Sequence, residues 1–178
     1  MAEQDSSNQG NGSGPDQTEP QIATLAQYIK DLSVENPSSP QVFQWQTQPS
    51  PEVQIGLNSV KVADDVHEVS LKLELTARSE NGVHFVVDLT YAGLFGLRNI
   101  PDEALGPILL VELPRMLFPF ARQIIADAVG NTGFPPLLLD PIDFGAAYMA
   151  QLEAAQQQDG DAGETAAAET PSEEPTES

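Results

Sequence analysis

A strictly alternating stretch from Val69 to Arg78 constrains the fold of this chain more than any other feature. Apolar side chains stand at every odd position of this stretch, and polar side chains stand at every even position. A period of two places the apolar groups on one face of a strand and the polar groups on the other. The stretch therefore predicts a β-strand with one buried and one solvated face.

The alternation resumes after Asn81-Gly82, a pair that favours a tight hairpin turn because both residues tolerate positive φ. One face of this second strand is expected to carry Val83, Phe85, Val87, Leu89 and Tyr91. The opposite face is expected to carry His84, Val86, Asp88 and Thr90. Together the two strands predict an antiparallel hairpin.

A third strand is predicted upstream, where Val53, Ile55 and Leu57 alternate. Val60 and Val62 continue on the other parity, which predicts a bulge or sharp twist near Asn58-Ser59. The earliest apolar segment is ambiguous. Ile22, Leu25, Ala26, Ile29 and Leu32 fit a helix, whereas Tyr28, Leu32 and Val34 fit a strand whose other face carries Asp31, Ser33 and Glu35.

After Pro101 the apolar period becomes helical and continues to Val129, before the glycines of residues 130–133. Pro114 is expected to divide a short helix from a longer one, because proline removes a helical N–H. A last helix is expected to begin at Asp143, a good N-cap residue, and to run through Leu152. Strands followed by helices indicate the α+β class.

The charge of the chain predicts its domain limits. It has 27 acidic and 7 basic residues in 178, and eight of the carboxylates lie in residues 153–178, where there is no Lys or Arg. Residues 1–20 are equally poor in apolar groups, so both ends are predicted to be disordered tails. Residues 21–152 are then expected to form one domain.

The missing residue types argue against a catalyst. The chain has no cysteine and two histidines, which excludes a disulfide framework, a thiolate nucleophile and a zinc site built from several histidines. No Gly-rich phosphate loop or Ser/His/Asp constellation is visible, so no enzyme activity, ATP use or cofactor is expected. His67 beside Asp64, Asp65 and Glu68 is interpreted as a charged turn, with no metal expected there.

The start of the sequence lacks a basic patch and an apolar stretch, so no signal peptide is expected. The longest apolar region, residues 105–126, is interrupted by prolines and charged residues, so no membrane span is expected and a cytoplasmic location follows by elimination. A sequence pI of about 4.1 disfavours nucleic acid and anionic lipid as partners and favours basic ones.

Five separated stretches resemble the SecB family of export chaperones in order and spacing. They are residues 28–37, 63–69, 117–122, 133–137 and 140–144, and the resemblance spans about residues 28–152. It implies that the ambiguous first segment is a strand, in a four-stranded antiparallel sheet backed by C-terminal helices. It also implies a cytoplasmic homotetramer, a dimer of dimers, that binds unfolded precursor polypeptides without ATP and delivers them to the motor ATPase SecA.

A receptor for unfolded chains needs a long apolar groove, because its clients offer intermittent apolar groups and free backbone. We expect this groove between the sheet and the helices. Its candidate residues are Phe43, Trp45, Leu94, Phe95, Met116, Leu117, Phe120 and Phe134. For each of them, a place in the core or in a subunit interface is the alternative.

The resemblance implies two further surfaces. In the family, acidic residues matching Asp31, Glu35 and Asp88, with an apolar residue matching Val86, receive the basic, zinc-binding tail of SecA; a merely solvated sheet face is the alternative. Val87, Leu89 and Tyr91 match positions that support subunit association, with core packing as the alternative. Two other functions stay open at this point: a related holdase for another client, such as an antitoxin, and a small enzyme without a recognisable motif.

Overall fold

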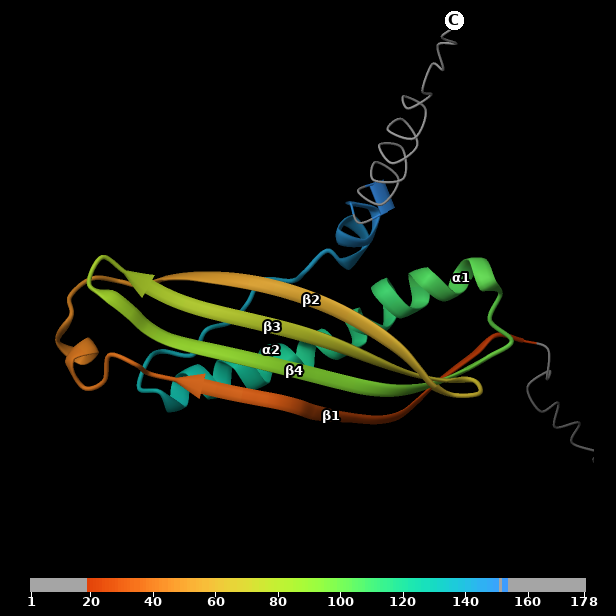
Figure 1. The fold of residues 1–178 in the computed structure, drawn as a ribbon, viewed down its shortest axis with the longest axis horizontal. Helices are drawn as coiled ribbons and strands as arrows, with labels where there is room; N and C mark the ends of the chain where they lie inside the picture. Colours follow the sequence, from red (N-terminus) through yellow and green to blue (C-terminus); the bar gives the residue numbers. More distant parts are fainter. Residues whose placement is uncertain (1–18, 151, 154–178) are drawn as a thin grey trace, which may run out of the picture.

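The computed structural model describes residues 19–150 and 152–153 (Figure 1). The predicted tails, apart from residues 19, 20 and 153, lie outside the described residues. Four long strands, with one short 3-10 helix between the first two, come first in the chain, and the α-helices follow them, so the predicted α+β class is confirmed.

The four strands form one antiparallel sheet. They are β1 (Gln21–Glu35), β2 (Ser50–Ala63), β3 (Val66–Ser79) and β4 (Gly82–Arg98). Their order across the sheet is β1-β4-β3-β2, so β1 and β2 are the edges (Figure 1). The first segment is therefore a strand, as the family resemblance implied.

The alternation in β3 and β4 defines the core. The odd-numbered residues from Val69 to Ala77 are fully buried. Their partners across the ladder are also buried: Leu71 faces Tyr91, Leu73 faces Leu89, Leu75 faces Val87 and Ala77 faces Phe85. We call this the inner face of the sheet and the opposite one the outer face. Each such pair removes two apolar side chains from water, which is the main stabilising contribution of the sheet.

Two details of the predicted sheet are wrong. Pairing of β2 with β3 is regular through Asn58 and Ser59, and the irregularity lies between Lys61 and Ala63. Val60 lies opposite Glu68 on the outer face without a bulge, whereas Val62 is the residue at the irregularity; both side chains are exposed. In the hairpin, Gly82 has a φ of 137°, but Asn81 does not have positive φ.

The helical region is one continuous run of three segments. They are α1 (Asp102–Pro107), the π-helical turn η2 (Ile108–Glu112) and α2 (Leu113–Asn131). Pro114 does not divide the helix as predicted. The N–H of Leu113 donates to the carbonyl of Ile108, and this wider turn directly before Pro114 places the proline in the first turn of α2, where no N–H is needed.

Helix α2 covers the inner face of β3 and β4 with buried residues that include Leu117, Ala121 and Ile125. The run Asp102–Asn131 is also long and apolar enough to cross a membrane, a test that the core helix of a soluble protein passes as well. Burial of one side against the sheet is sufficient reason for its apolar composition.

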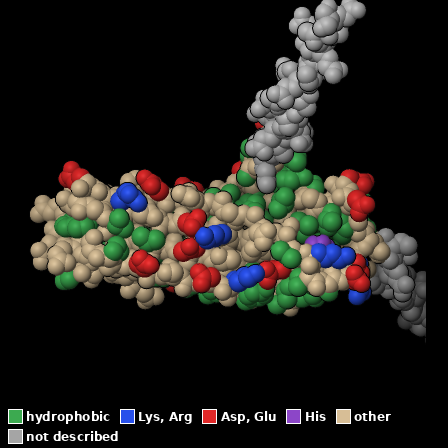
Figure 2. Space-filling model, in the orientation of Figure 1, with side chains coloured by type: hydrophobic (Ala, Val, Ile, Leu, Met, Phe, Trp, Pro, Cys, Tyr) green, Lys and Arg blue, Asp and Glu red, His purple; other side chains and the backbone are tan. Residues whose placement is uncertain are grey.

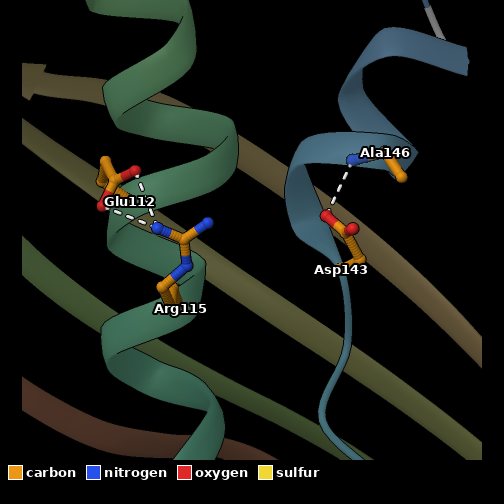
Figure 3. A network of polar contacts seen from close by, with 4 residues as sticks. All are labelled: Glu112, Arg115, Asp143 and Ala146. Carbon is orange, nitrogen blue, oxygen red and sulfur yellow. Dashed lines mark hydrogen bonds and ion pairs between the residues drawn. The ribbon is translucent and has the colours of Figure 1, made fainter.

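The last helical segment begins where it was predicted. Residues 144–150 are helical, and Asp143 Oδ1 accepts the N–H of Ala146 at 2.9 Å (Figure 3). The same figure shows Arg115 pairing with Glu112 across the junction of η2 and α2, at 3.0 Å. Phe144 and Tyr148 anchor this segment to the core.

Candidate functional site

A hollow of about 500 Å³ lies at the end of the sheet where β3 turns into β4. Its walls come from the 3-10 helix η1 (Gln41–Gln44) and the chain after it, from β3 and β4, and from residues 134–137. Phe134 is at its centre, with ring centroids 5.6 Å from Phe43 and 5.2 Å from Phe85. We call this hollow the aromatic groove and define it by Phe43, Trp45, His84, Phe85 and Phe134.

Gly133 allows the two sides of the aromatic groove to approach. Its φ is 91°, and a Cβ at this position would lie 3.0 Å from Cε1 of Phe43. Both the backbone conformation and the close approach favour glycine. Phe43 therefore packs over the end of α2 while its ring stays 53% exposed to solvent.

His84 enters the aromatic groove because of a bulge in β4. The register of β3 and β4 shifts between Ala77 and Arg78, so that Ala77 pairs with Phe85 and Arg78 with Val83. His84 is the extra residue, and its ring lies 4.9 Å from Trp45 and 5.7 Å from Phe134. The predicted place of His84, on the outer face beside Val86, is thus wrong, because a bulge re-aims the side chain that it inserts.

The aromatic groove continues along the edge strand β2 as two further apolar hollows. The next hollow, of about 340 Å³, shares Pro51 and Leu137 with the groove. A third, of about 330 Å³, shares Ile55 and Ile142 with the second and ends at Tyr148. An apolar channel therefore runs beside β2, from the end of the sheet at the β3–β4 turn to the C-terminal helical segment.

The structure brings together three of the eight candidate groove residues, Phe43, Trp45 and Phe134. Phe95 and Leu117 have no exposed surface and belong to the core of the subunit, which removes them from a groove in this chain. Met116 and Phe120 lie on α2, 46% and 52% exposed, away from the groove walls. Leu94 pairs with Ala26 and Glu68 on the outer face.

The candidate SecA residues share the outer face of β1 and β4. Glu35 lies opposite Val86, Ser33 opposite Asp88, and Asp31 opposite Thr90. We call Asp31, Glu35, Val86 and Asp88 the acidic face. Figure 2, which shows the side of the sheet away from α2, has acidic and basic side chains interspersed over the strands.

Sequence reasoning missed two charged neighbours of the acidic face. Glu74 lies opposite Asp88 in the ladder, and Lys72 Nζ is 2.8 Å from Glu74 Oε1 and 3.4 Å from Asp88 Oδ2. The hydrogen bond to Glu74 and the attraction of Asp88 raise the pKa of Lys72. The alternation in the sequence places Lys72 and Glu74 on the polar face of β3, but it does not show which residues of β4 they lie opposite.

Val87, Leu89 and Tyr91 lie on the inner face, as expected, and all three are buried within this one subunit. Core packing, the alternative interpretation, therefore describes all three residues in the single subunit, and their role in subunit association stays a prediction. The neighbouring row on β1 is exposed: Val34 lies opposite Val87, Leu32 opposite Leu89 and Ile29 opposite Tyr91.

Glu68 forms a small polar cluster with β1 on the outer face. Tyr28 Oη and Lys30 Nζ both donate to its carboxylate. The hydrogen bond from Lys30 and then that from Tyr28 lower the pKa of Glu68, and the hydrogen bond to Glu68 raises that of Tyr28. Within residues 19–150 and 152–153, no three His, Asp or Glu side chains are placed to hold a metal ion.

The chain matches known proteins over most of its length. The family model described as "Preprotein translocase subunit SecB" matches residues 15–155. The protein-export protein SecB of Sphingopyxis alaskensis is 52% identical over 139 residues, 78% of this chain and 81% of the relative. That of Zymomonas mobilis subsp. mobilis is 54% identical over 134 residues, 75% of this chain and 82% of the relative.

The fold is similar to that of a solved SecB-like chaperone from Mycobacterium tuberculosis, in complex with a peptide from an antitoxin. The TM-score is 0.57 with 15% identity, covering 68% of this chain and 90% of that one. Because the family model covers more than half of the sequence and these relatives are about half identical to it, this chain belongs to the SecB family of protein-export chaperones.

Proposed function

We propose that this chaperone holds unfolded precursor polypeptides in the aromatic groove without nucleotide, in the cytoplasm, and delivers them to SecA. The observation that carries the proposal is an aromatic hollow that stays open in the folded subunit and continues as an apolar channel beside β2. The SecB family is not a class of enzymes, and the lack of catalysis stays a prediction.

The size of the channel fits weak, reversible holding. Burial of about 400 Å² of client apolar surface, at roughly 25 cal/mol per Å², contributes on the order of 10 kcal/mol before costs. Ordering of the client cancels much of this gain. Several grooves in one assembly would restore affinity, since each further contact along one client becomes intramolecular.

A test of holding uses a chemically denatured precursor that aggregates on dilution. The wild-type protein should suppress the rise in light scattering with no nucleotide present, and Phe43→Ser with Phe134→Ser should weaken this suppression. Val60→Ser, an exposed apolar position on the outer face, is the matched control. Full suppression by the doubly substituted protein would remove the client role of the aromatic groove.

The acidic face is the proposed docking surface for SecA, whose basic zinc-binding tail would meet Asp31, Glu35 and Asp88 beside the apolar Val86. Support comes from the ladder, which places all four on one face of two adjacent strands. Asp31→Lys with Glu35→Lys should weaken SecA binding in calorimetry and leave client holding intact, because the acidic face and the groove are on opposite faces. Asp64→Lys with Glu80→Lys, at the two hairpin turns, makes the same change in net charge as a control. Equal SecA affinity for both double variants would contradict this docking surface.

We further propose assembly as a homotetramer, a dimer of dimers. Support comes from the exposed inner-face row on β1, Ile29, Leu32 and Val34, and from the exposed apolar groups on α2. An apolar edge strand that is exposed to solvent favours aggregation, and a second copy of the chain that covers this strand prevents it. Mass measurement by light scattering should give four subunits, and Leu32→Glu should give smaller species. A wild-type monomer at working concentration would overturn the assembly.

A further inference from the structure

The hydrogen bonds near the β3–β4 turn, at one end of the aromatic groove, favour one of the two ring nitrogens of His84 as the site of its proton. The main-chain N–H of Asn81 donates to Ser79 Oγ at 3.3 Å, and the Thr47 hydroxyl donates to the same oxygen at 3.1 Å. Thr47 Oγ1 itself accepts from the side-chain amide of Asn81 at 2.9 Å. With the Thr47 hydroxyl donating in this way, both lone pairs of Ser79 Oγ are in use, and its own proton is left to donate.

The acceptor for that proton is His84 Nε2, 2.8 Å from Ser79 Oγ. Neutral imidazole has one donor and one acceptor nitrogen, so an accepting Nε2 places the ring proton on Nδ1. Nδ1 is buried and has no partner in the described part of the chain. A buried N–H without an acceptor is costly, so this donor is set to bind whatever acceptor enters the groove.

The surroundings of Nδ1 select the kind of acceptor. The rings of Trp45 and Phe134 flank the imidazole, so an entering group must carry apolar neighbours of its own. A net charge of −20 disfavours a carboxylate. A main-chain carbonyl is neutral, recurs at every residue of an extended polypeptide and has apolar side chains beside it.

We propose that the Nδ1–H of His84 donates a hydrogen bond to a main-chain carbonyl of the polypeptide held in the aromatic groove. The inference rests on the proposed role of that groove as the client site. It gives the groove a contact that every unfolded chain can satisfy, so affinity rises without selection for one sequence. Because Nδ1 is buried, the proposal requires a neighbouring ring to be displaced when the carbonyl enters; the half-buried ring of Trp45 is 4.9 Å from the imidazole.

Three substitutions at position 84 test the donor. His84→Asn keeps an N–H one bond beyond Cγ, where Nδ1 lies, whereas His84→Gln places its amide one bond farther, near the position of Nε2. His84→Phe keeps the ring and removes both nitrogens. The probe is a labelled, unstructured peptide of Leu, Ser and Phe, and the readout is fluorescence anisotropy.

We expect the Phe and Gln variants to bind this peptide roughly 3- to 10-fold more weakly, and the Asn variant to stay within about twofold of the wild type. Should the Phe variant not fold, the contrast between Asn and Gln carries the test. Equal binding by the Asn and Gln variants, whether strong or weak, would overturn the proposal. Phe134→Ser tests the aromatic groove independently of the His84 hydrogen bond. Full peptide affinity in that variant would show that the groove is not the client site.

Heteronuclear NMR of the imidazole nitrogens supplies an independent reading. The free wild-type protein should carry the His84 proton on Nδ1. Ser79→Ala should shift the ring toward the other tautomer and weaken peptide binding, because Nε2 loses its donor. A proton found on Nε2 in the wild type would contradict the inference.

Discussion

At the scale of single residues, Glu68 links the edge strand β1 to β3 through its hydrogen bonds from Lys30 and Tyr28. These bonds favour the ionised carboxylate and hold its pKa below the usual range. A depressed folded-state pKa means that the stabilisation is present above the unfolded value and is lost as pH falls through the folded one. The cluster therefore makes the attachment of β1 sensitive to acid.

We predict that Glu68→Gln destabilises the protein near neutral pH and that the difference from the wild type shrinks below about pH 4, where the carboxylate of the unfolded chain is already protonated. Because the cluster is near the surface, the loss at neutral pH should be about 1 kcal/mol. Urea unfolding across a pH series measures this, with Glu80→Gln at the β3–β4 turn as the control. A difference that is constant with pH would count against the linkage.

At the scale of secondary-structure elements, β4 and α2 pack closely at Gly93. A Cβ there would lie 2.6 Å from Cε2 of Phe95 and 3.0 Å from Cδ2 of Leu117, and both of those side chains are fully buried. Gly96, on the same strand, has no neighbour closer than 3.8 Å. The packing of helix on sheet thus depends on the absence of one side chain.

We predict that Gly93→Ala lowers the free energy of unfolding by about 1–3 kcal/mol, because the packed core cannot absorb an extra methyl group. Gly96→Ala should be tolerated. Denaturant melts at equal protein concentration compare the two. Equal stability of both variants would show that β4 and α2 pack less tightly at this point than we describe.

Asp143 determines where the C-terminal helical segment begins, and this segment closes the far end of the channel beside β2. Asp143→Ala removes an N-cap worth about 1 kcal/mol, so we predict faster hydrogen exchange in residues 144–150 with little change in the sheet. Asp143→Ser keeps a capping oxygen and should restore protection. Unchanged exchange in the Ala variant would mean that packing of Phe144 and Tyr148 alone holds the segment.

The elements differ in how far sequence could predict them. The inner face of β3 and the N-cap at Asp143 followed from local pattern, because each depends on residues close in sequence. The assignment of β1 needed the family resemblance, since its apolar residues fit both periods. The unbroken helix through Pro114 and the bulge at His84 depend on tertiary packing, which leaves no regular pattern in the sequence.

At the scale of the whole molecule, the sheet separates an apolar surface from a charged one. The inner side and its rim carry the apolar channel, and the outer side carries the acidic face. Figure 2 shows charged side chains spread over that outer side. The acidic residues lie on one face, as expected from the strand that the family resemblance implied and from the parity of residues along each strand. Sequence reasoning gathered the groove residues only in part: Phe43, Trp45 and Phe134 do line the aromatic groove, whereas Phe95 and Leu117 belong to the core.

This separation predicts opposite responses to salt. Binding of SecA should weaken as ionic strength rises, because exposed charges are screened over about 8–10 Å at physiological salt. Client holding should be unchanged or stronger, since burial of apolar surface does not depend on screening. Titrations of both partners over a salt series measure the two responses. A parallel loss of both affinities would contradict separate docking surfaces.

The most direct test of the account uses Trp45, the single tryptophan of the chain, which lies in the wall of the aromatic groove. Addition of a denatured precursor that lacks tryptophan should change the Trp45 emission saturably, over the same concentrations that suppress client aggregation, and Phe134→Ser should weaken both effects together. Suppression of aggregation with no change in Trp45 emission would show that clients bind elsewhere, and the aromatic groove would lose its role.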